Sequence, residues 1–505
     1  MIPMSRYYIT TAIPYVNAKP HLGHVLEFIE TDVLVRWLRQ NGGEVRFQTG
    51  SDENSLKNVL SAQKAGVAVK DFVDANTKNF QDIYPLYEIA YDDYIRTTEE
   101  RHKEGVLKLW QALNPEDIYK KSYKGLYCIG CESFLKESDL VDGCCPEHKT
   151  KPEVIEEENY FFKLSKYQNQ LLELITTDKI KIIPESRKNE VLSLLKSGLE
   201  DISISRSRER AKGWGIEVPG DPSQIIYVWI DALANYITAL NYGSDGKDFQ
   251  KWWMDSDEIW HVIGKGISRF HAVYWPAILL SANLKTPDHI FVHGYLTTEG
   301  EKISKSLGNV IDPVEAAKAY GIEPLRYFLT HEISAYDDGD FSAKRFWERY
   351  NSDLAGGIGN LLSRVTTLGE LFGKVVRLSK VEDSVKNLVQ DNVKRFTASM
   401  TVAHFNETLD VLWELVRFCD KYVADNKVWE TIKTDQDKAE KELANLVYAL
   451  AHIGWQLKPF MPETGEKIIK SLDLDDEGID FLTKLSNQIV SLKKAEMLFP
   501  RHGQA

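Results

Sequence analysis

The feature that most constrains this sequence is the passage from an apolar run into the motif Pro20-His21-Leu22-Gly23-His24. Residues 7–13 predict a buried strand, because they are almost all apolar or β-branched. Beyond the motif, apolar residues recur every three or four positions, as on one face of a helix: Leu22, Leu26, Ile29, Val33 and Trp37. The two histidines therefore stand where a strand gives way to a helix. The free N–H groups and positive dipole end of that helix favour a phosphate there.

Polar residues follow the next predicted strand, residues 45–49, in the stretch Ser51-Asp52-Glu53-Asn54. A strand, a helix and a second strand in succession predict an α/β fold with a doubly wound, Rossmann-like parallel sheet, which binds ligands at the carboxyl ends of its strands. We predict further strands at 225–230, 259–264 and 289–295. An isolated stretch of this kind is most often only a helix cap. Beside a nucleotide site, we interpret Asp52 as the partner of a positively charged group on a substrate.

The bulk composition restricts the class of protein. A length of 505 residues with 43% hydrophobic residues is enough for two or three globular domains. No apolar run reaches the length of a membrane span, and residues 1–12 lack the layout of a secretory signal. We therefore expect a cytoplasmic protein with no membrane partner. The formal net charge of −13 argues against DNA or RNA as a partner unless specific motifs overturn it.

Four of the five cysteines lie within residues 128–145. Cys128 and Cys131, followed by Cys145 and His148, place two ligands in each of two turns, which predicts a closed tetrahedral site for one structural Zn²⁺. Cys144 competes with Cys145 as the third ligand, but it would change the final spacing. We place this zinc knuckle in an insertion between two halves of the α/β domain.

Two lysines three residues apart, Lys302 and Lys305, lie in the Ser- and Gly-containing stretch 299–309. Such a loop suits the delivery of positive charge to a polyphosphate, although alone it would be ordinary surface. From about residue 345 the strand signals fade and helical periodicity dominates. We predict a separate helical bundle there.

In this order, the histidine motif and the stretch Lys302-Ile303-Ser304-Lys305-Ser306 resemble those of the class I aminoacyl-tRNA synthetases. Within that class, essentially the whole chain resembles the methionyl-tRNA synthetase family. The resemblance is carried by the zinc knuckle, the surroundings of Trp429, and residues 9–24, 49–54, 227–236, 259–276, 293–309 and 359–364. It implies activation of methionine by ATP with Mg²⁺, and transfer of methionine to the 3′ end of tRNA(Met).

The resemblance also implies roles for individual residues. Positive charge at the reacting phosphate comes from His21, His24, Lys302 and Lys305. No general base is needed, because an α-carboxylate with a pKa of about 3.5 is already an anion. The ATP-binding residues are His21, Gly23, His24, Glu27, Gly294, Lys302 and Lys305. The methionine-binding residues are Ile13, Tyr15, Asp52, Trp229, Ala232, Leu233, Tyr236, Ile267, Phe270 and His271. The anticodon-binding residues are Asn360, Arg364 and Trp429.

Five segments follow from these assignments. We expect the first half of the catalytic domain at 1–116, the insertion with the zinc knuckle at 117–224, the second half of the catalytic domain at 225–300, the lysine loop with a linking segment at 301–344, and the helical anticodon-binding domain at 345–505. Because the chain ends soon after the bundle, we expect a monomer.

The sequence departs from the commonest family pattern at Asn54, Leu233 and Gly266, which affects the shape of the pocket rather than the reaction. Asn54 stands where a histidine is frequent. Two alternatives stay open, namely another class I synthetase and a non-catalytic tRNA-binding regulator descended from a synthetase. The isoleucyl, valyl and leucyl types carry a larger insertion than residues 117–224. The presence of both histidines and both lysines argues against the regulator.

Overall fold

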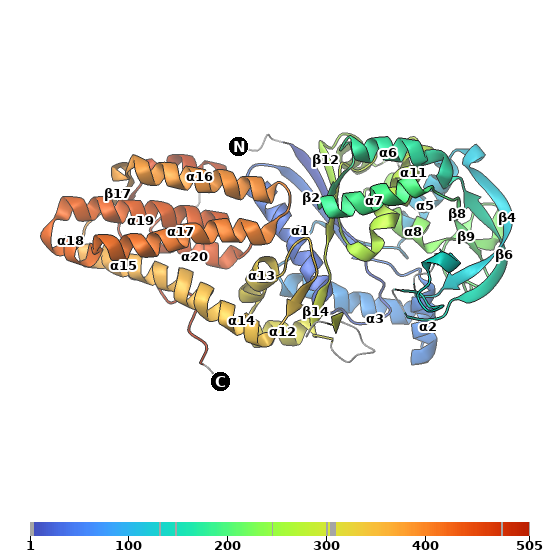
Figure 1. Ribbon diagram of the computed structural model, residues 1–505, viewed down its shortest axis with the longest axis horizontal. Helices are drawn as coiled ribbons and strands as arrows, with labels where there is room; N and C mark the ends of the chain where they lie inside the picture. The colour runs from blue at the N-terminus through green and yellow to red at the C-terminus, as the bar shows by residue number, and fades with distance from the viewer. Residues whose placement is uncertain are drawn as a thin grey trace.

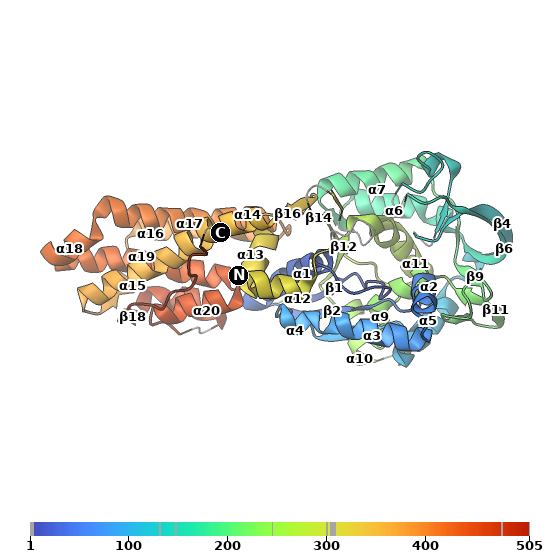
Figure 2. The same ribbon diagram turned by 90° about the horizontal axis from the view of Figure 1, so that it is seen from below.

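The computed structural model describes residues 5–130, 133–146, 149–244, 246–298, 301–302, 310–475 and 478–503. Figure 1 shows an elongated molecule with an α/β domain at one end and a bundle of helices at the other. The view from below in Figure 2 shows the same division. Within the described ranges, no helix is both long and apolar enough to cross a membrane.

A six-stranded parallel sheet forms the centre of the α/β domain, as predicted. Its strands, in sheet order, are β3 (Asp93–Arg96), β2 (Glu44–Ser51), β1 (Arg6–Thr11), β12 (Glu258–Gly264), β13 (His289–His293) and β7 (Lys181–Ile183). The direction of winding reverses between β1 and β12. A doubly wound sheet binds its ligands at the carboxyl ends of the strands at such a reversal.

Alternate residues of these strands enter two different hydrophobic cores, because successive side chains of a strand point to opposite faces. In β1, Tyr7 and Ile9 join the core on the side of α1, whereas Tyr8 joins the core on the other face. The first face is covered by α1 (Leu22–Gln40), α3 (Val69–Gln81) and α4 (Ile83–Leu86). The second is covered by α5 (Glu100–Ala112), α6 (Gln168–Thr176), α7 (Glu185–Ser197), α8 (Val228–Leu233), α9 (Asn235–Thr238) and α11 (Trp275–Ser281).

The strand predicted over residues 225–230 is confirmed only for Ile225 and Ile226, which lie outside the main sheet. β11 (Asp221–Ile226) instead pairs antiparallel with β10 (Glu217–Val218) and β9 (Ser205–Ser207) in a separate small sheet. Val228 then begins helix α8. A short apolar run does not distinguish a strand from a buried helix, and here the second half of the run is helical.

The segment expected as an insertion forms its own sheet and also returns to the main one. β4 (Ile118–Cys128) and β6 (Glu153–Phe162) are long antiparallel strands at the far end of the α/β domain, flanked by β5 (Ser133–Leu135) and β8 (Ile202–Ser203). The edge strand β7 of the main sheet lies within the same stretch of sequence. Residues 117–224 therefore contribute to both sheets.

The C-terminal domain is helical, as predicted. One continuous helix, made of α14 (Ala343–Arg349), a π-helical stretch (Tyr350–Gly359) and α15 (Asn360–Phe372), runs from the α/β domain along the bundle (Figure 1). The other helices that form the bundle include α16 (Asp383–Met400), α17 (Phe405–Asn426), α18 (Val428–Thr434), α19 (Gln436–Leu457) and α20 (Pro462–Ser471). A short pair, β17 (Val376–Arg377) and β18 (Ile489–Val490), joins the chain after α15 to the C-terminal segment.

Helix α13 (Ile322–His331), which follows α12 (Pro313–Tyr320), joins the two domains through a fully buried arginine. Arg326 donates to the Asp32 carboxylate of α1 at 2.6 Å and to the Tyr87 carbonyl at 3.1 Å. On the other side it donates to the carbonyls of Phe460 at 2.8 Å and Pro459 at 3.1 Å, in the turn between α19 and α20. The guanidinium thus bonds groups of both domains at once.

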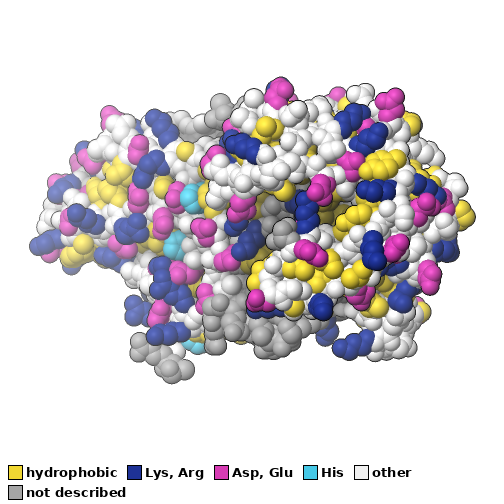
Figure 3. Space-filling view, turned by 45° about the vertical axis from the view of Figure 1, so that its right-hand side comes forward, with side chains coloured by type: hydrophobic (Ala, Val, Ile, Leu, Met, Phe, Trp, Pro, Cys, Tyr) yellow, Lys and Arg dark blue, Asp and Glu magenta, His cyan; other side chains and the backbone are white. Residues whose placement is uncertain are grey.

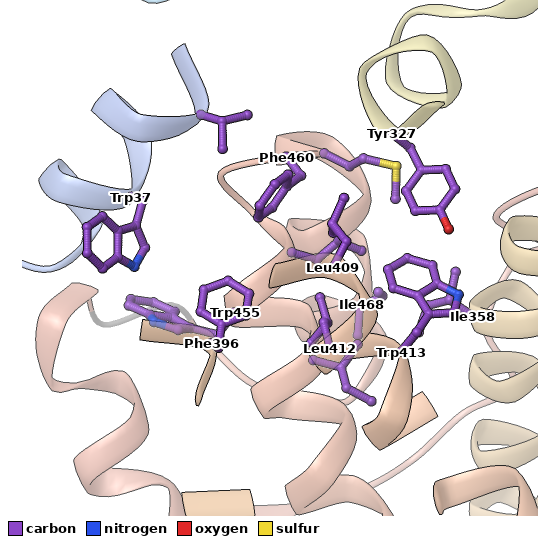
Figure 4. Close-up of a cluster of buried hydrophobic side chains, with 14 of the residues drawn as sticks. Trp37, Tyr327, Ile358, Phe396, Leu409, Leu412, Trp413, Trp455, Phe460 and Ile468 are labelled. Carbon is purple, nitrogen blue, oxygen red and sulfur yellow. The ribbon is translucent and has the colours of Figure 1, made fainter. Parts of the chain in front are cut away.

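A second ionic side chain and a common core strengthen this junction. Glu323, one turn before Arg326, accepts hydrogen bonds from the backbone N–H of Glu463 at 2.6 Å and from that of Thr464 at the start of α20. Figure 4 shows the apolar cluster nearby, in which Trp37 of α1 lies with Trp455 of α19. One hydrophobic core therefore extends from a face of the main sheet into the helical domain.

Arg326→Met should lower the free energy of unfolding by about 3 kcal/mol, because it leaves the buried Asp32 carboxylate without its interdomain partner. Asp32 keeps its contact with Arg36, so a larger loss is not expected. Arg395→Met breaks a partly exposed ion pair with Glu414 and should cost less than about 1 kcal/mol. Urea unfolding of both variants measures the difference. Equal losses would contradict the role of Arg326 in joining the domains.

Candidate active site

A cavity of about 700 Å³ opens at the carboxyl ends of β1 and β12. It is lined by all ten residues that we assigned to methionine: Ile13, Tyr15, Asp52, Trp229, Ala232, Leu233, Tyr236, Ile267, Phe270 and His271. It is also lined by five of the residues that we assigned to ATP: His21, Gly23, His24, Glu27 and Gly294. The structure thus brings side chains from distant stretches of sequence to one cavity at the reversal point of the sheet.

The two histidines of the motif form one unit at the start of α1. The backbone N–H of His21 donates to Nδ1 of His24 at 3.1 Å, and the two rings stack with centroids 3.8 Å apart. A Cβ atom on Gly23 would lie 3.0 Å from the His21 ring, so glycine leaves room for this stack. The first turn of α1 carries no acidic residue, and the positive end of its dipole is therefore not neutralised from within the helix.

The lysine loop is attached beside the histidines at both of its ends. Before the loop, β15 (Glu301–Lys302) pairs with β14 (Leu296–Thr298), whose first residue lines the cavity. After it, the Ile311 carbonyl accepts a hydrogen bond from the N–H of Leu22, the first residue of α1, at 3.1 Å. Lys305 and the side chain of Lys302 lie outside the part of the chain that the structure describes. The described flanks nevertheless place both ends of the loop next to the histidine motif.

Aromatic side chains form one wall of the cavity. The rings of Trp229 and Phe270 stack almost parallel, with centroids 3.8 Å apart. Tyr15 meets Trp229 edge to face at 6.4 Å. Because Trp229 lies on α8 and Phe270 follows β12, the stack joins two elements within this wall. Such a surface suits an apolar, polarisable side chain.

Tyr236 and His271 form an uncharged hydrogen-bonded pair in the same wall. Burial lowers the pKa of His271 to about 4 and raises the pKa of Tyr236 well above its usual value. The Ile267 carbonyl, 3.0 Å from Nδ1 of His271, can only accept a hydrogen bond, so Nδ1 carries the ring proton. Nε2 then accepts from the Tyr236 hydroxyl at 2.7 Å. The Tyr236–His271 pair is therefore uncharged at physiological pH.

Asp52 lies where the sequence placed it, directly after β2. Its carboxylate accepts a hydrogen bond from the backbone N–H of Asn54 at 3.2 Å, and its own N–H donates to the Pro14 carbonyl at 2.9 Å. These bonds hold the loops after β1 and β2 side by side, with Tyr15 opposite Asp52. A carboxylate thus faces the cavity next to its aromatic wall.

Comparisons with known proteins decide the family. Residues 7–151 and 138–366 match the family described as tRNA synthetases class I (M), and residues 374–499 match the anticodon binding domain of methionyl tRNA ligase. A methionine–tRNA ligase of Brucella suis biovar 1 is 39% identical over 513 residues, which cover 99% of this chain and 98% of that protein. One of Fusobacterium nucleatum is 40% identical over 480 residues, 93% of this chain and 75% of that protein. This chain belongs to the class I methionyl-tRNA synthetases.

The structural comparison agrees with the sequence comparisons. A Mycobacterium tuberculosis methionyl-tRNA synthetase in complex with methionyl-adenylate matches with a TM-score of 0.90 at 35% identity, over 99% of this chain and 100% of that chain. Its apo form matches with a TM-score of 0.84 at 32% identity, over 99% of each chain. As a member of this family, the chain is an aminoacyl-tRNA ligase.

His293 is among the residues that line this synthetase cavity but were not assigned to a ligand from the sequence. It ends β13, and its Nε2 lies 2.9 Å from Oε2 of Glu27, while its Nδ1 lies 2.7 Å from the Gly294 carbonyl. Burial opposes the charged ring, but the hydrogen bond with Glu27 and the nearby Glu30 outweigh it and raise the pKa of His293 to about 9. In Glu30, by contrast, burial is the main cause that raises the pKa, to about 8. The sequence signal that could have identified His293 was its place near the carboxyl end of a predicted parallel strand.

The zinc knuckle expected for this synthetase stays a prediction. Cys128 at the end of β4 and Cys145 are buried, and Cys145 lines the cavity. Buried thiols at turns suit zinc. Cys131 and His148 lie outside the described residues, and among those that are described no group of three or more His, Cys, Asp or Glu side chains could hold a metal ion.

The three expected anticodon-binding residues lie on neighbouring helices of the bundle. Asn360 begins α15 and is exposed, and Arg364, one turn later, bonds Asp420 of α17 at 3.0 Å. Trp429 is the second residue of α18 and is 38% exposed. Few large apolar side chains among the described residues are as exposed. α15 packs against α18, which lies at the end of the molecule farthest from the α/β domain (Figure 1).

Glu27→Gln should destabilise the protein in a pH-dependent way. Because the folded pKa of His293, about 9, exceeds its ordinary value of 6.5, the ion pair contributes fully to the free energy of unfolding below the ordinary value and is lost as the pH rises through about 9. Thermal midpoints of the wild type and the variant should therefore differ most near pH 6 and converge above about pH 9. A gap that does not change with pH would contradict a charged His293.

Proposed function

We propose that this synthetase activates methionine with ATP to give methionyl-adenylate and pyrophosphate, and then transfers methionine to the 3′ end of tRNA(Met). The observation that carries the proposal is the convergence of the assigned histidine, aromatic and carboxylate side chains on one cavity at the reversal point of the sheet. The cavity has a region at the start of α1, where the positive end of the helix dipole attracts phosphate, and a neutral aromatic region around Tyr236. These two regions correspond to a triphosphate and a thioether side chain.

In the proposed activation step, the protein supplies positive charge and orientation. The methionine carboxylate is already an anion, so its attack on the α-phosphate needs no base. His21 and His24, at the positive end of α1, stabilise charge that accumulates on the phosphates, and Lys302 and Lys305 add charge from the loop anchored beside them. Mg²⁺ enters with ATP and neutralises part of the triphosphate charge.

In the proposed amino-acid site, recognition divides between a carboxylate and the aromatic wall. Asp52 receives the ammonium group together with the backbone of Ile13. The thioether lies against Trp229, Phe270 and the neutral Tyr236, where sulfur finds polarisable neighbours. Since one methylene changes binding by only about 1–3 kcal/mol, this wall alone gives modest discrimination against shorter or longer apolar side chains.

The helical domain provides the proposed contact with the tRNA anticodon. Bases of a single-stranded loop are read by stacking on aromatic rings and by hydrogen bonds at their edges, for which Trp429, Asn360 and Arg364 are suited. Acidic and basic side chains are interspersed on the face in Figure 3, so we expect local contacts rather than one broad basic surface to hold the tRNA.

The remaining proposals concern organisation. We assign Cys128, Cys131, Cys145 and His148 to one structural Zn²⁺, which would clamp the tip of the insertion against the cavity. The segments 1–116, 117–224, 225–300, 301–344 and 345–505 keep the roles expected above, with β7 as a contribution of the insertion to the main sheet. A monomer that works in the cytoplasm, where ATP and tRNA are available together, completes the proposal.

Amino-acid-dependent ATP–pyrophosphate exchange tests the proposed function directly. Of the twenty amino acids, only methionine should support rapid exchange. Lys305→Ala should slow exchange by more than about tenfold, because one charge at the phosphates is lost, while the thermal midpoint should stay close to that of the wild type. Exchange with another amino acid, or no exchange at all, would refute the proposal.

Trp429→Ala should impair the transfer of methionine to tRNA but not the activation of methionine. Loss of a stacking surface worth about 1–3 kcal/mol per base should reduce the rate of tRNA charging at limiting tRNA by about tenfold or more. ATP–pyrophosphate exchange should be unaffected, since α18 is far from the cavity. Parallel assays of exchange and charging check this result. Equal damage to both activities would mean that Trp429 is structural.

A further inference from the structure

A chain of hydrogen bonds joins four polar side chains behind the methionine side of the cavity. Nδ2 of Asn54 donates to Oδ2 of Asp231 at 2.8 Å, and Nε2 of His102 lies 2.6 Å from Oδ1 of the same carboxylate. Nδ1 of His102 lies 2.7 Å from the Thr238 hydroxyl. His102 and Asp231 are buried, on α5 and α8, whereas Asn54 follows β2. None of these side chains lines the cavity, so any effect on a substrate must pass through other residues.

The network reaches the cavity at two places. At one end, the backbone N–H of Asn54 bonds Oδ1 of Asp52, the carboxylate assigned to the ammonium group. At the other end, Asp231 lies on α8 between Trp229 and Ala232, which both line the cavity. The same hydrogen bonds thus connect the ammonium partner with the wall that encloses the side chain.

An asparagine suits position 54 for a chemical reason. The two N–H groups of its amide have two acceptors, the Thr97 carbonyl at 3.0 Å and the Asp231 carboxylate at 2.8 Å. An aspartate of the same shape would donate to neither and would place a negative charge against Asp231. A neutral imidazole has only one ring N–H. Asn54 therefore serves both acceptors at once.

Stability alone does not account for such a network. A buried carboxylate loses its hydration, and apolar packing at the same place often stabilises a core equally well. A fully paired polar network does fix one geometry, because each member must meet its partner at hydrogen-bond distance. The geometry fixed here is the position of Asp52 relative to α8.

We propose that Asn54 is a positioning residue for methionine, which holds the Asp52 carboxylate and the α8 wall in register through Asp231 and His102. The proposal rests on the proposed function, since it requires Asp52 to receive the ammonium group. Methionine then meets both of its recognition elements at the correct separation. ATP binds around the start of α1 and does not depend on this register. Disruption of the network should therefore weaken the binding of methionine and leave the binding of ATP unchanged.

Asn54→Asp should raise the KM for methionine in ATP–pyrophosphate exchange by at least about tenfold and leave the KM for ATP within about twofold of the wild-type value. Asn54→Ala removes the donors without adding a charge, and it should give a smaller change in the same direction. As a matched control, Asn76→Asp makes the same chemical change on α3, where the amide donates to the Phe72 carbonyl of its own helix. This control should change neither KM.

The double variant Asn54→Asp with Asp231→Asn reverses donor and acceptor in the central hydrogen bond. Relative to Asn54→Asp alone, it should recover part of the lost methionine affinity, while the Thr97 carbonyl stays without its side-chain donor. An unchanged KM for methionine, equal increases for both substrates, or a double variant no better than the single ones would overturn the proposal. Thermal midpoints show whether Asn54→Asp folds, and Asn54→Ala decides the test if it does not. A wild-type protein without methionine-dependent exchange would refute the proposed function instead, so the two failures are distinguishable.

Discussion

The relative placement of the two proposed sites depends on one buried guanidinium. Arg326 bonds the Asp32 carboxylate of α1 and carbonyl groups on both sides of the domain junction. A planar group with five N–H donors can satisfy this many acceptors at once, which an ammonium group cannot do in the same plane. Because α1 begins at the histidine motif, the contact that joins the domains also fixes the helix whose positive end faces the cavity.

Charge is segregated within the cavity. On the phosphate side, the start of α1 carries no acidic residue in its first turn, and the nearby Glu27 carboxylate is paired with a charged His293. On the methionine side, burial keeps both Tyr236 and His271 neutral, and the Tyr236 hydroxyl donates a hydrogen bond to Nε2 of His271. A polyanion and a thioether therefore meet different electrostatic environments a short distance apart, which favours one orientation of the two substrates.

Much of the cavity could be predicted from the sequence, because residues such as Asp52 directly follow strands whose parallel arrangement brings their ends together. The run 225–230 could not be assigned, since six apolar residues carry no clear period and only packing decides between strand and helix. The place of His293 near the end of a predicted strand was a local signal, but its pairing with Glu27, 266 residues away, left none. The contact between Arg326 and Asp32 spans 294 residues. Such long-range pairs leave no local pattern, and the fold alone reveals them.

The continuous core between the sheet and the bundle has a consequence for how a long substrate is selected. Apolar side chains and the buried Arg326–Asp32 ion pair fill the junction, and this packing opposes changes in the separation between the cavity and the exposed Trp429. A stiff nucleic acid must span that separation to occupy both places together. One with an acceptable loop but arms of the wrong length would engage one end and miss the other. Under the proposed function, the distance between the two sites would therefore contribute to the selection of the RNA, together with its bases.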